Sequence, residues 1–238
     1  MMPMGKGKVP MSEMFYRYIF KGKTNTFSYT VTLDKDSLRL VSKEVAKAPD
    51  WVQLNNNKCS HCPLLQEDSP QCPVAMCLHD LCLSFMGSKS YDQYDITVET
   101  NHRSYAYNTD LQTGLKSLFG LIMPTCGCPH TKFLRPLTRF HLPFDDFEST
   151  VQRSLGNYLI ARFLSPEIKN SEIADLNDLK ILYENIGLVN KFFMRRIQSH
   201  INASDANQNA IVILNSISEL MAIEWETNFE SIAHLYAV

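Results

Sequence analysis

The chain has 238 residues, of which 45% are apolar and 20% charged, and its formal net charge is −2. These values are typical of a globular protein with a sizeable core, so they exclude intrinsic disorder. The near balance of charges makes nucleic acid an unlikely partner, because a general nucleic-acid-binding protein needs a basic face to meet phosphates.

Targeting signals are weak in this sequence. No apolar stretch approaches the roughly 20 residues needed to cross a bilayer, so we expect no membrane insertion. Residues 1–12 contain a basic run without the apolar region of a signal peptide, and we interpret them as a flexible lead-in. The cytoplasm is therefore the expected location. Thiols stay reduced there, so the seven cysteines favour metal-binding or core roles over a disulfide framework.

Short runs with strand patterns dominate the first part of the chain. Residues 15–20 are aromatic and β-branched, residues 27–33 alternate apolar with polar side chains, and residues 37–41 continue that alternation. These three runs predict a meander. Residues 94–100 and 103–107 predict a separate β-hairpin.

Helical patterns begin before this hairpin and dominate after it. Residues 73–85 and 111–122 space apolar side chains three and four apart, which predicts two amphipathic helices. Asp145 or Asp146 is expected to cap a further helix, which stops before Pro166.

Two long amphipathic patterns end the sequence, from about residue 175 to 201 and from about 205 to 236, with a short polar turn between them. They predict an antiparallel helical hairpin. The expected fold class is therefore α+β. A β-rich half with a cysteine loop, residues 13–109, would share one core with a helical half, residues 110–238.

The cysteines give the strongest chemical signal. A structural zinc site needs four thiolate or imidazole ligands, often a Cys-x-x-Cys loop plus two distant residues. Cys59 and Cys62 have this spacing, and Cys72 and Cys128 are the predicted third and fourth ligands. Proline directly follows Cys62, Cys72 and Cys128 and stiffens the backbone there, which would help to hold a preset geometry.

The remaining cysteines and two histidines surround this set. Cys77 and Cys82 fall on the apolar face of the helix predicted over residues 73–85, so we interpret them as small core residues. Cys126 either replaces Cys128 or lies beside it. His61 and His130 flank the predicted ligands and are reserve ligands.

Zinc is the favoured metal, although four thiolates also suit an iron–sulfur cluster. With all four positions filled, the metal would lock the fold by tying the two halves together and would leave no room for substrate. A redox dithiol at Cys59 and Cys62 is an alternative, but the βαβ setting expected for that motif is missing.

The motifs as a set resemble a bacterial domain family that carries no assigned function. Its motifs include a Cys-x-x-Cys-Pro loop, a Cys-Pro step, and a Gly-Cys-Pro step before a His-Leu-Pro-Phe segment. They match Cys59, Cys62, Cys72 and Cys128, with residues 141–144 following. The resemblance runs from about the first strand to the last helix. It implies an intact domain with a cysteine-based centre and implies no reaction.

A polar segment over residues 130–141 is a second candidate site. Arg135 and Arg139 would share one face of a helix, and with His141 they could bind a small anion, because guanidinium groups match carboxylate and phosphate. The alternative interpretation is a solvated basic face, or arginines paired with acidic neighbours.

Three functional hypotheses follow. The favoured one is a cytoplasmic, metal-stabilised binding or regulatory module without catalysis of its own, acting on a protein or a small anion. The second is an enzyme of unfamiliar type, with a pocket around His130, Arg135, Arg139 and His141. The third is a cysteine-based redox or metal sensor. Familiar phosphate-binding, hydrolase and metalloprotease motifs are absent from the sequence.

Overall fold

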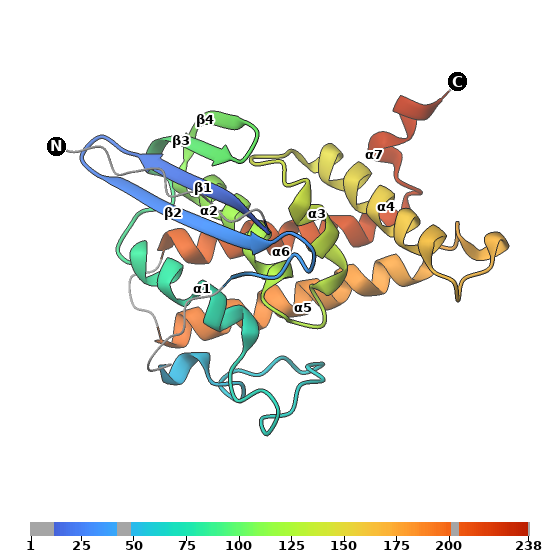
Figure 1. The fold of residues 1–238 in the computed structure, drawn as a ribbon, viewed down its shortest axis with the longest axis horizontal. Coiled ribbons are helices and arrows are strands. Elements are labelled where there is room, and N and C mark those ends of the chain that lie inside the picture. The colour runs from blue at the N-terminus through green and yellow to red at the C-terminus, as the bar shows by residue number, and fades with distance from the viewer. Residues whose placement is uncertain (1–11, 42–48, 201–204, 238) are drawn as a thin grey trace.

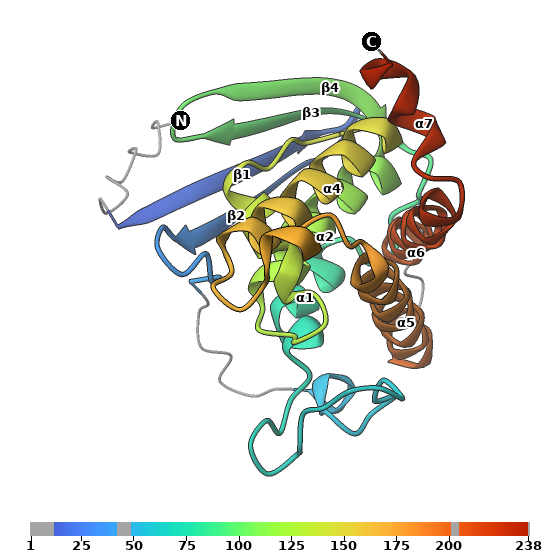
Figure 2. The same ribbon diagram turned by 90° about the vertical axis from the view of Figure 1, so that its right-hand side faces the viewer.

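A computed structural model describes residues 12–41, 49–200 and 205–237. The predicted lead-in lies almost entirely outside this part of the chain. The described residues form a four-stranded antiparallel sheet and a set of mainly C-terminal helices, which confirms the predicted α+β class. Figures 1 and 2 show the sheet as one layer, with α1 and α2 beneath it and the paired α5 and α6 alongside.

The strands are β1 (Glu13–Lys21), β2 (Thr26–Asp34), β3 (Gln93–Thr100) and β4 (Ser104–Asp110). The α-helices are α1 (Pro73–Ser84), α2 (Leu111–Ile122), α3 (Arg135–Arg139), α4 (Phe147–Leu164), α5 (Asn177–His200), α6 (Asp205–Glu226) and α7 (Glu230–Ala233). Short 3₁₀ turns are η1 (Asp50–Val52), η2 (Met123–Thr125), η3 (Lys132–Leu134), η4 (Asn170–Glu172) and η5 (His234–Tyr236).

The sheet has the order β2-β1-β3-β4, and the predicted hairpin forms as β3 and β4. The predicted meander is wrong in its third member. Residues 37–41 form no strand, because Leu38 adopts a left-handed conformation and only Leu40 bridges back to Leu33. The other edge of β1 pairs instead with β3, which is distant in sequence.

One face of the sheet supplies much of the core. Alternate residues of β1 (Tyr16, Tyr18 and Phe20) are buried, together with residues of β2 and β3 on the same face. α2 crosses this face closely at Gly114, where an added Cβ would collide with the side chains of Phe20 and Ile96. A glycine here therefore sets the distance between helix and sheet.

The helical half follows most of its predicted boundaries. Asp146 caps α4 by accepting a hydrogen bond from Ser149, and α4 ends before Pro166. α5 and α6 pack against each other as the predicted hairpin, while its turn at 201–204 lies outside the described residues. The predicted continuation of the last helix to residue 236 is wrong. α6 ends at Glu226, because left-handed Asn228 and Phe229 redirect the chain into α7.

Two clusters of buried side chains fill the interior. The larger joins the sheet to α1, α2 and the adjoining ends of α5 and α6. The smaller lies among α4, α5, α6 and α7. No helix in the described ranges combines the length and the apolar character that crossing a membrane requires.

Candidate functional site

Cys59, Cys62 and Cys72 lie on a long irregular loop between η1 and α1. This loop projects from the lower side of the molecule in Figures 1 and 2. Backbone hydrogen bonds close its two ends, since Leu54 N donates to Pro70 O at 2.9 Å and Cys72 N donates to Val52 O at 2.8 Å. The closure brings the Cys-x-x-Cys segment back toward the start of α1.

Each predicted ligand occupies a defined backbone position. Cys62 N donates to Cys59 O at 3.0 Å, which forms a tight turn between these two residues. Cys72 is the N-cap of α1, with Pro73 at the first helical position, so its thiol lies at the positive end of the helix dipole. Cys128 lies between η2 and η3 and is 8% exposed.

Two histidines join the cysteine loop to the segment that carries Cys128. The rings of His61 and His130 lie 3.9 Å apart, and His130 Nε2 is 3.0 Å from His61 O. His61 Nε2 is also 3.1 Å from Asn185 O on α5. The two predicted reserve ligands therefore link the cysteine loop, the segment that carries Cys128, and α5.

The thiols of Cys62, Cys72 and Cys128 are close enough to Cys59 to influence its ionisation. Burial raises the pKa of Cys59 to about 12, and Cys72, Cys128 and Cys62 raise it further in that order of effect. Burial also raises the pKa of Cys128, with a smaller contribution from Cys72. Cys126 belongs to the same neighbourhood, because Cys128 and Cys72 raise its pKa as well.

All seven cysteines carry free thiols. Within the described ranges, no three His, Cys, Asp or Glu side chains are arranged as a ready-made metal site. Coordination would require these side chains to turn toward a common point.

A buried arginine next to this cluster was missed in the sequence. Arg196 of α5 is 2% exposed, and its guanidinium donates to Trp51 O and Gln53 O at 2.6 Å each and to Leu54 O at 3.3 Å. Burial lowers its pKa, an effect that Cys72, Cys59 and Cys62 oppose. It therefore anchors η1 and brings a positive charge beside the thiols. The available signal was a charged residue on the apolar face of α5.

The other cysteines take separate roles. Cys82 is fully buried, and Cys77 packs partly buried against the same core, in line with the predicted core roles. Cys126 lies beside Cys128: its thiol approaches Met123 O at 3.0 Å and Ile122 O at 3.4 Å. Burial raises the pKa of Cys126, and its hydrogen bond with Cys77 raises it further.

The predicted basic segment is helical, but its two arginines diverge. Pro136 fits the first turn of α3, so it begins the helix and does not break it. Arg135 Nε donates to Pro124 O at 3.1 Å, whereas Arg139 Nη1 donates to Lys35 O at 3.0 Å. Arg139 and His141 line one surface depression, and Arg135 is not part of its lining.

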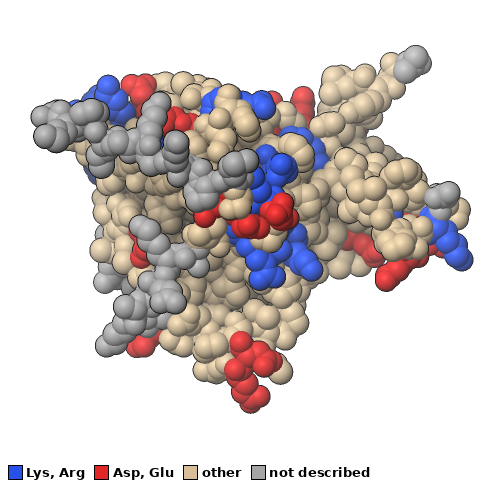
Figure 3. Space-filling view, viewed as in Figure 1, with Lys and Arg blue, Asp and Glu red and all other residues tan. Residues whose placement is uncertain are grey.

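This basic depression has a volume of about 380 Å³. Its lining includes the four cations Lys35, Arg103, Arg139 and Arg153 and contains no Asp or Glu. Figure 3 shows Lys and Arg gathered near the middle of this face, over α3 and the neighbouring ends of β1 and β2, with some acidic side chains beside them. The depression is therefore locally positive although the whole chain is slightly negative.

His141 is held firmly behind this depression. Its Nε2 lies 2.6 Å from the Tyr18 hydroxyl, which lies 2.8 Å from Ser117 Oγ, and its ring meets Tyr16 edge to face. Burial lowers the pKa of His141 to about 3, and the nearby Arg153 lowers it further. His141 is therefore a neutral packing residue at physiological pH.

This burial predicts a pH dependence of stability. Between about pH 6.5, the ordinary pKa, and about pH 3, the unfolded chain binds a proton at His141 that the folded chain does not. The free energy of unfolding should therefore fall by up to about 1.4 kcal/mol per pH unit as pH decreases through this window. His141→Gln should remove this component of the slope. Urea titrations of both proteins at several pH values test this, and equal slopes would refute it.

Comparisons with known proteins give one positive result. No curated protein and no solved structure matches the chain. A family model described as a domain of unknown function, DUF6901, matches residues 14–237. This match confirms the predicted resemblance to a domain family without an assigned function. The chain therefore belongs to the DUF6901 family.

Proposed function

We propose that this protein is a metal-stabilised binding or regulatory module without catalysis of its own. Cys59, Cys62, Cys72 and Cys128 would hold one metal ion, with zinc favoured over an iron–sulfur cluster. The proposal is supported by the effect of Cys72, Cys128 and Cys62 on the pKa of Cys59, since Cys128 comes from a segment far from the other three in the sequence.

The metal would compensate for the weak packing of the cysteine loop. Between η1 and α1 this loop has few buried apolar side chains, so packing alone holds it weakly. A metal on four thiolates would fasten the loop to the segment after η2. Arg196 would offset part of the net negative charge of such a site. Four protein ligands leave no open position for substrate.

Removing the metal should therefore unfold or loosen the molecule. We expect a zinc chelator to lower the melting temperature, and added zinc should restore it, since a ligand that binds only the folded state stabilises it. Calorimetric melts of the same preparation with chelator, and then with excess zinc, measure the effect. Visible absorbance that fades on chelation would identify an iron–sulfur cluster. Identical melts with and without metal would contradict the structural role.

The ligand that the surface favours is a small anion in the basic depression. Lys35, Arg103 and Arg139 converge there from three separate segments without an acidic residue in the lining, and Arg153 adds a fourth cation whose charge is partly offset by its ion pair with Asp145. Such convergence of cations suits phosphate or carboxylate groups. An acidic protein segment would use the same charges and is the larger alternative ligand.

Thermal shifts with pyrophosphate test this ligand class. Arg139→Ala should weaken pyrophosphate binding about tenfold or more, since a hydrogen bond to a charged group contributes about 1.5–3 kcal/mol. The matched control is Arg17→Ala, which removes an arginine paired with Glu99 outside the depression. Equal loss of binding in both variants would mean that the effect is non-specific charge.

Two alternatives have less support. The enzyme pocket would need His130 to join Arg139 and His141, but His130 packs on His61 and His141 is bonded to Tyr18. A redox sensor needs an exposed thiol of low pKa, whereas burial raises the pKa of Cys59 and Cys128. The free thiols fit the reducing cytoplasm, which we propose as the location.

A further inference from the structure

A second hollow lies among the helices, between α2, α3, α4, α5 and α6. Its volume is about 170 Å³, and apolar side chains such as Leu134, Ile186 and Leu214 form much of its wall. Gly120 and Leu142 also line the hollow and are exposed, so it opens to solvent there. An engineered protein cavity of about 150 Å³ accepts benzene. The hollow is therefore large enough for one six-membered ring with a small substituent.

One side of α2 forms part of this wall. Lys116, Gly120 and Met123 line the hollow and recur at intervals of four and three residues, which places them on one helical face. The opposite side of α2 is buried against the sheet in the larger cluster. The face that carries Lys116 and Gly120 is therefore the one turned to the hollow.

Gly120 leaves the hollow accessible from this face. Among the described residues, an added Cβ at Gly120 would meet only the side chain of Leu214, at 3.9 Å, which is ordinary contact. Leu214 is itself a wall residue, so a larger side chain at position 120 would reach into the hollow. Glycine inside a helix is destabilising relative to alanine. Packing does not require this glycine, and its effect is to keep the space open.

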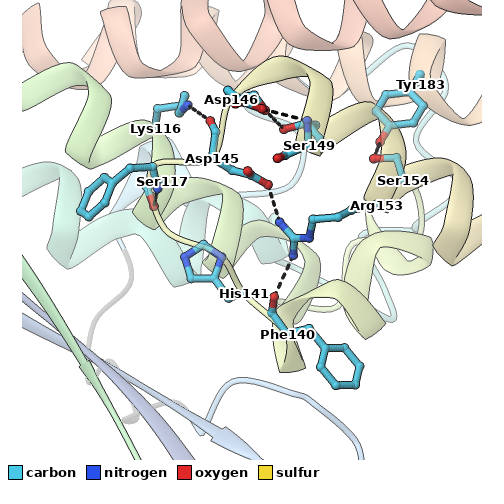
Figure 4. Close-up of polar contacts among 12 residues, drawn as sticks. Lys116, Ser117, Phe140, His141, Asp145, Asp146, Ser149, Arg153, Ser154 and Tyr183 are labelled. Atoms are coloured by element: carbon cyan, nitrogen blue, oxygen red, sulfur yellow. Dashed lines mark hydrogen bonds and ion pairs between the residues drawn. The ribbon is translucent and has the colours of Figure 1, made fainter. Parts of the chain in front are cut away.

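The charges of the wall favour an anionic group. Its charged side chains are two cations, Lys116 and Arg153, and one carboxylate, Asp145. Figure 4 shows the Asp145 carboxylate held by Arg153 at 2.8 Å, whereas Lys116 donates to the backbone oxygen of Asp145 at 3.2 Å. An ammonium group has three donors, so Lys116 can serve a further acceptor. Burial lowers the pKa of Lys116, Asp145 and Asp146 oppose that effect, and a bound carboxylate would oppose it further.

We propose that this hollow binds a small monocarboxylate, whose ring-sized apolar body lies between α2, α4 and α6 and whose carboxylate accepts a hydrogen bond from Lys116. The apolar wall would supply affinity for the body, and the charge-assisted hydrogen bond would select the carboxylate. The site is separate from the basic depression and independent of the metal. The walls of the two hollows share only His141, Leu142 and Arg153.

Benzoate and nitrobenzene test the preference for a carboxylate, because they have nearly the same shape and differ in charge. Their affinities for the full chain are measured by calorimetric titration. Lys116→Met should reduce the ratio of benzoate affinity to nitrobenzene affinity about tenfold or more, because it deletes a charged donor. The control is Lys191→Met on α5, an exposed lysine outside the wall, which should leave the ratio unchanged. An unchanged ratio in Lys116→Met would overturn the proposal. Loss of benzoate binding in Arg139→Ala instead would place benzoate in the basic depression and overturn the proposal as well.

A second variant tests the hollow itself and covers the case in which Lys116→Met fails to fold. Leucine is a better helix former than glycine, so Gly120→Leu should melt no lower than the parent. Its side chain should occupy the hollow and weaken binding of both probes about tenfold or more, because the ring loses its buried site. The matched control is Gly156→Leu on α4, where an added Cβ meets nothing within 4 Å and the position lies outside the wall. Unaltered binding in Gly120→Leu, or an equal loss in Gly156→Leu, would overturn the proposal.

Discussion

Protein carrying Cys62→Ser is expected to melt about 8–16 °C below the parent. A metal at about 1,000 times its dissociation constant stabilises the folded state by about 4 kcal/mol. For a chain of this size, each kcal/mol corresponds to about 2–4 °C in melting temperature. Serine is a poor metal ligand, so the variant should lose most of this stabilisation by the metal. Calorimetric melts of metal-loaded parent and variant measure the difference.

A neighbouring pair of cysteines provides the matched control. Cys128→Ser should lose metal and stability as Cys62→Ser does, because Cys128 is the proposed fourth ligand. Cys126→Ser should retain both, since a serine hydroxyl can donate to Ile122 O or Met123 O as the thiol does. Any remaining binding activity of Cys62→Ser should follow its folded fraction. If Cys126→Ser loses metal and stability and Cys128→Ser keeps both, Cys126 is the fourth ligand. A Cys62→Ser variant that folds normally but has lost a measurable reaction would favour a catalytic centre.

Arg196→Met is expected to destabilise the protein by at least about 3 kcal/mol. The guanidinium serves the carbonyl oxygens of Trp51, Gln53 and Leu54, and each buried group left without a partner costs about 1–3 kcal/mol. The variant should also weaken metal retention, because the positive charge beside the thiols is lost. Urea unfolding at constant metal concentration measures the first effect, and competition with a chelator measures the second.

The adjacent residue separates this effect from a general loss of charge. Arg195 is exposed and lies over the Phe192 ring, so Arg195→Met should cost less than about 1 kcal/mol. Arg196→Lys should be intermediate, because lysine keeps the charge but cannot reach several carbonyls with one planar fork. If Arg196→Met costs no more than Arg195→Met, the anchoring role of Arg196 is wrong.

Local signals in the sequence predicted the helices and the hairpin well. Capping and periodicity act within one or two turns, so Asp146 marked the start of α4 and the apolar spacing marked α2. The sheet order could not be predicted in this way. Both edges of β1 offer the same backbone groups, and only the tertiary fold selects β3 for one of them. The end of α6 could not be predicted either, because the left-handed residues that follow it, Asn228 and Phe229, are not glycines.

For the candidate sites, too, local patterns could be read from the sequence, whereas contacts set by the tertiary fold could not. Spacing and the prolines after cysteine led to the four-ligand prediction, which stays a prediction, because the described residues contain no ready-made group of three metal-binding side chains. Of the three residues predicted to bind an anion, Arg139 and His141 line the same depression and Arg135 does not, because the side chain of Arg135 donates to Pro124 O. Lys35 and Arg103 join the depression from strand ends distant in sequence. Arg196 is recognised as an anchor only when its buried carbonyl partners are known.

X-ray absorption at the zinc edge, combined with elemental analysis of the purified chain, tests the metal proposal most directly. The proposal predicts one zinc per chain, surrounded by four sulfur atoms at about 2.3 Å. Cys62→Ser and Cys128→Ser should each lose the metal or show only three sulfur atoms, and Cys126→Ser should keep all four. Folded protein free of metal, or a metal surrounded mainly by nitrogen and oxygen, would contradict the four-cysteine centre.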